Sequence, residues 1–334
     1  MGKGVSLMKV SVVVPVFESE ESLQSLVERV EAALSAVVDE HELILVNDGS
    51  TDGSWAVIER LTARYPWIRP INLMRNFGQH NAVLCGVRAA QYEVIATIDD
   101  DLQNPPEEIH KLLTELEQGF DVVYGVPEQE QHGLMRDLAS QITKLAMANA
   151  IGVKTVRNVS AFRVFRTQVR NAFALYDGPA VSIDVLLTWG TSRFSAVKVR
   201  HDPRRLGSSK YTLRKLATHA LNMLTGFSTV PLQLASGMGF VLTLFGIGLL
   251  VHVLARYFLE GTAPPGFYFL ASIITIFSGA QLFGLGIIGE YLARIHMRNM
   301  GRPAYVARDN APDRRSGTPH EEVAPPRQTS RPPQ

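Results

Sequence analysis

The sequence predicts an α/β protein with a mostly parallel central sheet, followed by two membrane-spanning helices. Three observations carry this prediction. Short apolar, β-branched segments alternate with segments of helical periodicity over the first two thirds of the 334-residue chain. Polar turns rich in Asp, Asn and Gly follow some of the apolar segments, and two long apolar segments occupy the last third. Strands that alternate with helices through short loops are typical of a three-layer α/β domain.

The expected strands are short apolar runs that would be buried on both faces of the sheet. They are Val10–Val14, Glu42–Val46, Ile68–Met74, Val94–Ile98, Asp121–Gly125, Ser160–Phe165 and Phe194–Val199. The expected helices repeat apolar residues every three or four positions. They are Glu20–Leu34, Trp55–Tyr65, a helix that follows Arg75–Asn81 and ends near Ala90, and Pro106–Gln118. Another amphipathic segment, Leu134–Ile151, is compatible with a helix on the sheet and with one on a membrane surface.

The most informative segment is Val94–Pro106, where an apolar strand runs directly into Asp99, Asp100 and Asp101 and then Gln103. The aspartates would lie at the carboxyl end of a parallel strand, where open α/β sheets bind ligands. Crowded carboxylates repel one another unless a cation joins them, and oxygen ligands favour Mg²⁺ or Mn²⁺. A solvated acidic turn is the alternative. The preceding strand and the two following prolines, which suit the first turn of a helix, favour the metal site.

The two long apolar segments run from about Leu232 to Leu254 and from about Phe267 to Ile288. Each approaches the roughly 20 residues that cross a bilayer, and their glycines suit close helix packing in lipid. A buried helical hairpin of a soluble protein is the alternative. Basic residues flank the pair, whereas the connecting loop Glu260–Gly266 has none. The positive-inside rule therefore predicts a protein of the inner (cytoplasmic) membrane with two spans, whose α/β domain and both termini face the cytoplasm.

Composition narrows the function classes. The net charge of +1 and pI near 7.9 give no support for a nucleic-acid-binding surface. The single cysteine, Cys85, excludes an internal disulfide and fits a reducing compartment. We expect five regions: an N-terminal extension (1–8), an α/β domain with interface helices (9–228), a transmembrane hairpin (229–293), a cytoplasmic juxtamembrane segment (294–308) and a disordered tail (309–334).

The chemistry that best fits an aspartate cluster beside membrane spans is glycosyl transfer from a nucleotide sugar to a lipid. No Gly-x-x-x-x-Gly-Lys-Ser/Thr segment is present, which disfavours a P-loop NTPase. A lipid phosphate is already anionic at neutral pH, so it needs cationic guidance more than a strong base. Arg163, Arg204 and Lys210 are the candidates, because such side chains can grip phosphate. For Arg205, Arg214 and Lys215, contact with anionic membrane lipid is an equally good explanation.

Several motifs, in order, resemble the family 2, GT-A-fold polyprenyl-phosphate glycosyltransferases. They are Val14–Phe17, Asn47–Ser50, Arg75–His80, Asp99–Glu107, Arg204–Tyr211 and Gly286–Tyr291. The resemblance covers about Lys9 to Arg308. It is strongest to the undecaprenyl-phosphate 4-deoxy-4-formamido-L-arabinose transferase type, and dolichyl-phosphate mannose synthases are more distant.

The resemblance implies roles for individual residues. Pro15, Phe17 and Asp48 would hold the nucleotide base and ribose. Asp99 and Asp101 form the Asp-x-Asp motif that serves donor, metal and catalysis, and Asp101 with Gln103 would hold the metal and diphosphate. The residues that would face the donor diphosphate or the lipid phosphate are Arg136, Arg163, Arg204, Ser209 and Lys210.

Three positions depart from the family pattern. Ser19 stands where the family has a nucleotide-contacting glutamate, Asn47 replaces the first aspartate of Asp-Asp-Gly-Ser, and Asp100 replaces a commoner alanine. Glu18 and Glu20 are candidates to replace the missing glutamate. These departures bear on base recognition more than on catalysis.

The resemblance implies an enzyme that transfers a single sugar, with inversion, from a nucleotide-diphosphate sugar to undecaprenyl phosphate. A UDP-sugar is the expected donor, and a homo-tetramer is the expected assembly. A GDP-mannose-dependent synthase and an inactive membrane-anchored scaffold that binds nucleotide sugars are the alternatives. A processive polysaccharide synthase is disfavoured, because a Gln-x-x-Arg-Trp segment is absent from the sequence.

Overall fold

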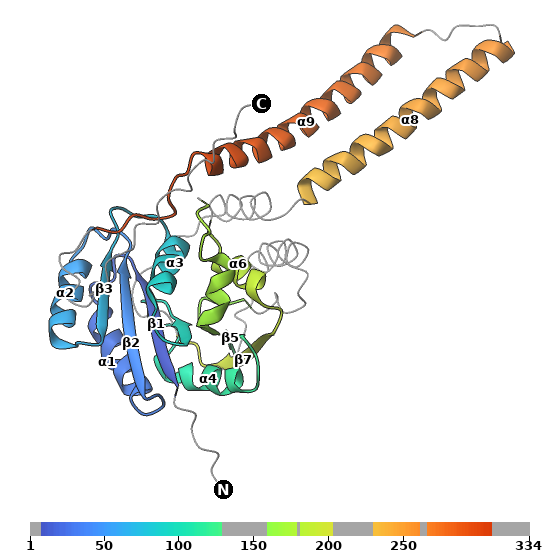
Figure 1. The fold of residues 1–334 in the computed structure, drawn as a ribbon. Helices are drawn as coiled ribbons and strands as arrows, with labels where there is room; N and C mark the ends of the chain where they lie inside the picture. The colour runs from blue at the N-terminus through green and yellow to red at the C-terminus, as the bar shows by residue number, and fades with distance from the viewer. Residues whose placement is uncertain (1–7, 129–158, 179–180, 203–229, 261–265, 309–334) are drawn as a thin grey trace, which may run out of the picture.

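A seven-stranded sheet lies at the centre of the computed structural model, which describes residues 8–128, 159–178, 181–202, 230–260 and 266–308 (Figure 1). The strand order is β3-β2-β1-β4-β6-β5-β7. The strands are β1 (Lys9–Val16), β2 (Glu40–Asn47), β3 (Ile68–Asn72), β4 (Val94–Thr97), β5 (Val122–Pro127), β6 (Arg163–Arg166) and β7 (Phe194–Val199). Only β6 pairs antiparallel with its neighbours among these strands, so the predicted mostly parallel sheet is confirmed.

Helices cover both faces of the sheet and divide the core into two clusters. They are α1 (Leu23–Leu34), α2 (Ser54–Arg64), α3 (Gln79–Ala89), α4 (Ile109–Glu117), α6 (Ile183–Gly190) and the 3₁₀ segments η1 (Pro106–Glu108) and η3 (Thr167–Phe173). Because side chains alternate along a strand, Val12 and Val14 of β1 pack with α1 and α4, whereas Val13 packs with α3 and α6. The result is the three-layer arrangement that the sequence predicts.

The structure differs from the sequence prediction in its second half. Helix α6 was not predicted, because Val181–Leu187 is buried on every side and lacks an amphipathic period. The predicted strand at Ser160 begins only at Arg163, since Phe162 donates its amide N–H to the Ser160 hydroxyl in a turn. The amphipathic segment Leu134–Ile151 lies outside the described residues.

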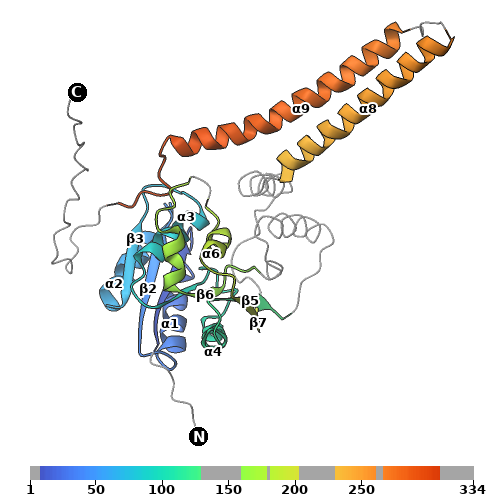
Figure 2. The same cartoon turned by 45° about the vertical axis from the view of Figure 1, so that its right-hand side comes forward.

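Two long helices, α8 (Val230–Glu260) and α9 (Phe267–Asn299), form a hairpin that projects away from the sheet (Figures 1 and 2). The segment Ile276–Ala293 of α9 is long and apolar enough to cross a membrane, and none of it is buried. The apolar stretch of α8, Leu232–Gly248, is shorter than the 18 residues that we require of a membrane span. Within the described residues the structure thus supports one span, and the second predicted span is not confirmed.

The chain returns to the α/β domain after α9 and pairs with the edge of the sheet. The Met74 amide donates to the Val306 carbonyl at 2.9 Å, and the Arg308 amide donates to the Asn72 carbonyl at 2.7 Å. Tyr305 packs against the cluster that contains buried Cys85. This segment therefore joins the end of α9 to the segment that leads into α3.

The thiol of Cys85 should report whether this C-terminal segment is docked. Burial raises the pKa of Cys85 to about 11, and Tyr305 is its hydrogen-bonding neighbour. Since the thiolate is the reactive form, the native thiol should react very slowly with Ellman's reagent at pH 8. We expect Tyr305→Ala to raise the rate at least about tenfold by opening the site. Tyr92→Ala is the control, because the Tyr92 ring is contacted by Lys9 and not by the C-terminal segment. Equal rates in both variants would contradict the docking.

Candidate active site

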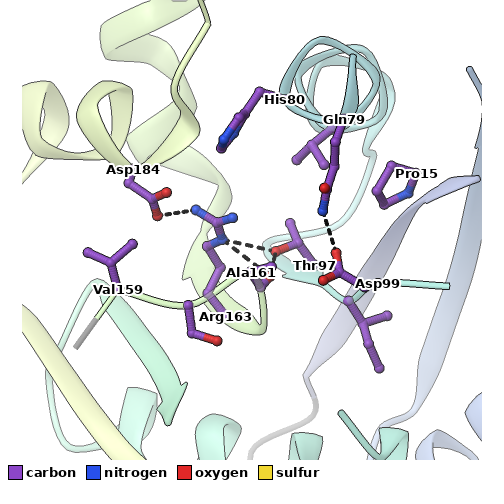
Figure 3. Close-up of a pocket in the computed structure, with 12 residues that line it drawn as sticks. Pro15, Gln79, His80, Thr97, Asp99, Val159, Ala161, Arg163 and Asp184 are labelled. Carbon is purple, nitrogen blue, oxygen red and sulfur yellow. Dashed lines mark hydrogen bonds and ion pairs between the residues drawn. The ribbon is translucent and has the colours of Figure 1, made fainter. Parts of the chain in front are cut away.

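The candidate site lies where the strand order reverses. β1 pairs with β2 on one side and with β4 on the other, so the carboxyl ends of β1 and β4 border a topological switch point. A pocket of about 270 Å³ opens there (Figure 3). Its lining consists of Pro15, Gln79, His80, Val83, Thr97, Ile98, Asp99, Val159, Ser160, Ala161, Arg163 and Asp184. Asp99, the first of the aspartates after β4, thus borders a cavity.

The three consecutive aspartates have three different partners. Asp99 Oδ1 accepts a 2.6 Å hydrogen bond from Gln79 Nε2, and Asp101 Oδ1 accepts the Gln103 amide N–H at 3.1 Å. Asp100 Oδ2 accepts the amide N–H of Phe17. Burial, followed by the charges of Asp101 and Asp100, raises the pKa of Asp99 to about 7. At neutral pH Asp99 therefore carries less negative charge than an ordinary aspartate does.

Asp48 fixes the loop that delivers Gln79 to the pocket. Its Oδ1 accepts the Phe77 amide N–H at 2.7 Å and its Oδ2 accepts the Gly78 amide N–H at 2.8 Å. Burial raises the pKa of Asp48, and these two amides oppose that rise. Gly78, with φ of 98°, immediately precedes α3, whose first residue is Gln79. Asp48 at the end of β2 and Asp99 at the end of β4 are thereby linked through one loop.

Gly49→Ala should disturb this loop. Gly49 has φ of +68°, and an added Cβ would lie 2.5 Å from the carbonyl carbon of Arg75 and from the amide nitrogen of Asn76. The side chain is strained and collides with backbone, so we expect a loss of about 2 kcal/mol or more in unfolding free energy. Gly301→Ala is the control, because Gly301 has a nearly equal φ of +62° but open space around the added Cβ. If both variants lose the same unfolding free energy in urea, the close approach between Gly49 and the backbone of Arg75 and Asn76 does not contribute to the loss.

A buried ion pair forms the opposite wall of the pocket. Arg163, at the start of β6, is 3% exposed and pairs with Asp184 in the first turn of α6. The Arg163 Nε donates to Thr97 Oγ1 at 3.1 Å, and the Tyr124 hydroxyl donates to Asp184 Oδ1 at 3.1 Å. Figure 3 shows the guanidinium between Asp184 and Thr97. Hydrogen bonds thus link the side chains of Thr97, Arg163, Asp184 and Tyr124 in one network.

The residues predicted from sequence fall into three groups. Pro15, Asp99 and Arg163 line the pocket together. Four others lie on adjoining loops or strand ends but do not line it: Phe17, Asp48, Asp101 and Gln103. Four lie outside the described residues: Arg136, Arg204, Ser209 and Lys210.

Comparison with known proteins shows the family. Residues 11–175 match the model of glycosyl transferase family 2. The undecaprenyl-phosphate 4-deoxy-4-formamido-L-arabinose transferase of Yersinia enterocolitica is 35% identical over 309 residues, which cover 91% of this chain and 94% of that protein. The transferase of the same name from Photorhabdus laumondii is 35% identical over 320 residues, with 95% and 98% covered. The chain belongs to glycosyl transferase family 2.

A solved structure is also similar to this glycosyltransferase. It is glucosyl-3-phosphoglycerate synthase from Mycobacterium tuberculosis in complex with Mn²⁺, uridine diphosphate and phosphoglyceric acid, with 15% identity and a TM-score of 0.48. The match covers 65% of this chain and 76% of that chain. At this level of similarity the assignment to the family rests on the sequence relatives.

The residues of the glycosyltransferase fit a divalent cation shared with a ligand. Within the described residues no group of three or more His, Cys, Asp or Glu side chains could hold a metal on its own. Mg²⁺, however, is commonly held by one or two carboxylates together with substrate phosphates. Asp99 and Asp101 supply two such carboxylates. Burial and, after it, the charge of Asp101 raise the pKa of Asp99, and a cation would relieve the repulsion between the two carboxylates.

Gln79 and Asp184 are among the pocket residues of the glycosyltransferase that carried no predicted role. Gln79 lies in the Arg75–His80 motif and donates to Asp99. Asp184 pairs with Arg163 although the two residues are 21 positions apart. A signal for Asp184 was present, because it is the one carboxylate in the apolar run Val181–Leu187, and buried charges need partners. Its partner could not be inferred, since only the fold brings α6 to β6.

Proposed function

We propose that this glycosyltransferase transfers one sugar from a nucleotide-diphosphate sugar to undecaprenyl phosphate at the cytoplasmic face of the membrane. The observation that carries the proposal is the 35% identity, over nearly the whole chain, to transferases named for that acceptor. The aspartates at the switch point and the apolar helix α9 give it independent support.

On the donor side, Asp99 and Asp101 would hold Mg²⁺ or Mn²⁺ together with the donor diphosphate, and Gln103 would assist them. When bound, the ion offsets the negative charge that grows on the departing nucleoside diphosphate. Gln79 orients the carboxylate of Asp99 through its 2.6 Å hydrogen bond. Pro15, Phe17 and Asp48 would hold the base and ribose, and a UDP-sugar is the donor we favour.

On the acceptor side, a phosphate oxygen of the lipid would attack the anomeric carbon directly. A new carbon–oxygen bond forms as the bond to the donor diphosphate breaks, so the configuration at that carbon inverts. Because the phosphate is already anionic, no proton has to be removed. Arg163 lines the pocket, and its charge is shared with Asp184. Further cations would come from Arg136, Arg204 and Lys210, with Ser209 as a hydroxyl donor.

The membrane arrangement is part of the proposal. We propose that α8 and α9 both span the bilayer, with the α/β domain (9–228), the juxtamembrane segment (294–308) and both termini on the cytoplasmic side. The exposed apolar side chains of both helices support contact with lipid; examples are Phe240, Leu244, Leu282 and Phe283. The juxtamembrane segment pairs with the last residue of β3 and with the residues that follow it, which ties α9 to the domain. We propose a homo-tetramer as the assembly.

The decisive experiment incubates detergent-purified protein with undecaprenyl phosphate, Mn²⁺ and a pool of UDP- and GDP-sugars. Mass spectrometry of the extracted lipid should reveal one added sugar, and Asp101→Ala should abolish it. The added mass and the donor consumed would identify the sugar class and separate UDP-sugars from GDP-mannose. Intact nucleotide binding without any lipid product would contradict the proposal and favour the scaffold.

A further inference from the structure

Asp100 lies between the two aspartates of the Asp-x-Asp motif, but its carboxylate is directed to a different loop. Its Oδ2 accepts the Phe17 amide N–H at 3.1 Å and also the Ser19 hydroxyl. Asp99 and Asp101 bond to Gln79 and to the Gln103 amide instead. Asp100 thus joins the loop after β4 to the loop after β1.

The loop after β1 has an unusual backbone that needs such support. Glu18 has φ of 53°, in the left-handed region that residues other than glycine rarely adopt. Its amide donates to the Ser50 hydroxyl at 3.1 Å, and the Ser19 amide donates to the Ser54 hydroxyl at 2.9 Å. A conformation of this kind persists where the surrounding structure holds it. Side chains from two neighbouring loops, including Asp100, hold this one.

The loop displays an aromatic ring at the carboxyl edge of the sheet. Phe17 is 43% exposed and stands two residues after Pro15, which lines the pocket. An exposed aromatic face offers a stacking surface to a planar base. Because Asp100 accepts the Phe17 amide, the backbone that carries this ring is ordered before any ligand binds. Such preorganisation lowers the entropy lost on binding.

We propose that Asp100 is a positioning residue for donor recognition, which holds Phe17 and Ser19 so that the nucleobase can stack on Phe17. This inference rests on the proposed function, since it presumes a nucleoside-diphosphate donor. Ser19 and Asp100 are both positions where the chain departs from the family pattern, and the structure brings the two into contact. The carboxylate that is missing at position 19 is therefore supplied from position 100.

The other carboxylates near this loop are engaged elsewhere. Glu18 Oε1 accepts the Thr51 hydroxyl at 3.2 Å, and Glu20 Oε2 accepts the Gly53 amide at 3.0 Å. Both point to the loop between β2 and α2. Among Glu18, Glu20 and Asp100, it is Asp100 that contacts the Ser19 hydroxyl.

The test compares a base-containing ligand with a base-free one. Calorimetry in the presence of Mn²⁺ would measure the affinity of the full-length protein for UDP and for pyrophosphate. We expect Asp100→Ala to weaken UDP binding about tenfold, or about 1.4 kcal/mol, and to leave pyrophosphate affinity unchanged. Asp100→Asn keeps an oxygen that can accept both hydrogen bonds, so its UDP affinity should stay within about threefold of the original. Glu59→Gln removes an exposed carboxylate from α2 and controls for net charge.

A variant that moves the carboxylate from position 100 to position 19 tests whether Asp100 positions the loop or only stabilises the fold. Ser19→Glu combined with Asp100→Ala returns a carboxylate to the loop from the other side, and it should recover UDP affinity relative to Asp100→Ala alone. Thermal melts of each variant identify any that fail to fold, and Ser19→Ala then tests the same contact from its other end. An equal loss of UDP and pyrophosphate affinity, or no loss at all, overturns the inference. Failure of the unmodified protein to bind UDP would overturn the proposed donor class instead.

Discussion

Asp101→Asn is expected to lower the turnover of lipid-linked sugar by at least about 10³-fold. Asp101 is one of two carboxylates that would hold the cation and the donor diphosphate, and its charge adds to that on Asp99. The asparagine retains an oxygen that can accept the Gln103 amide N–H, so the loop should keep its shape. Mass spectrometry of the lipid product, together with a thermal melt, would measure both effects.

Asp39→Asn provides the matched control for this loss. Asp39 is an exposed aspartate in the turn before β2, on the amino side of the sheet and far from the pocket. It removes the same charge by the same change of atoms, so turnover should remain within about twofold of the original. Should Asp101→Asn retain near-normal turnover while Mn²⁺ remains necessary, other residues must hold the cation.

Arg163→Met is expected to lower the free energy of unfolding by about 3–5 kcal/mol, the largest stability effect that we foresee. The substitution removes the cationic partner of buried Asp184. In the part of the chain that the structure describes, the Tyr124 hydroxyl then remains as its hydrogen-bond donor. Urea unfolding followed by tryptophan fluorescence would measure the change. All three tryptophans, Trp55, Trp67 and Trp189, belong to the α/β domain, so the signal reports on it.

Two comparisons show whether the loss of stability in Arg163→Met comes from the burial of the ion pair or from the loss of any ion pair. Arg29→Met breaks the pair with Glu107, whose carboxylate is 45% exposed, so the expected loss is within about 1 kcal/mol. Arg163→Met combined with Asp184→Leu removes both buried charges and should regain much of the stability lost by the single variant. A double variant as unstable as Arg163→Met would show that packing, not the unpaired carboxylate, causes the loss.

Sequence patterns were most informative where the arrangement of apolar and charged residues fits only one kind of element. The apolar run that ends at Asp99 predicted a central strand with carboxylates at a ligand-binding edge, and β4 has that position. The helical period of Leu23, Leu26, Val27, Val30 and Leu34 predicted α1, whose buried residues are these five. Patterns were silent for α6, because a segment buried all round shows no period.

The sequence by itself determined the α/β class, the aspartate motif, the apolar C-terminal segments and the family resemblance, because each depends on residues close together in the chain. Tertiary structure alone decided which distant side chains meet. It joins Arg163 to Asp184, Gln79 to Asp99, and Ser19 to Asp100. Such contacts depend on the strand order and on which loops leave the same edge of the sheet. These contacts arrange the residues of the motif around the pocket.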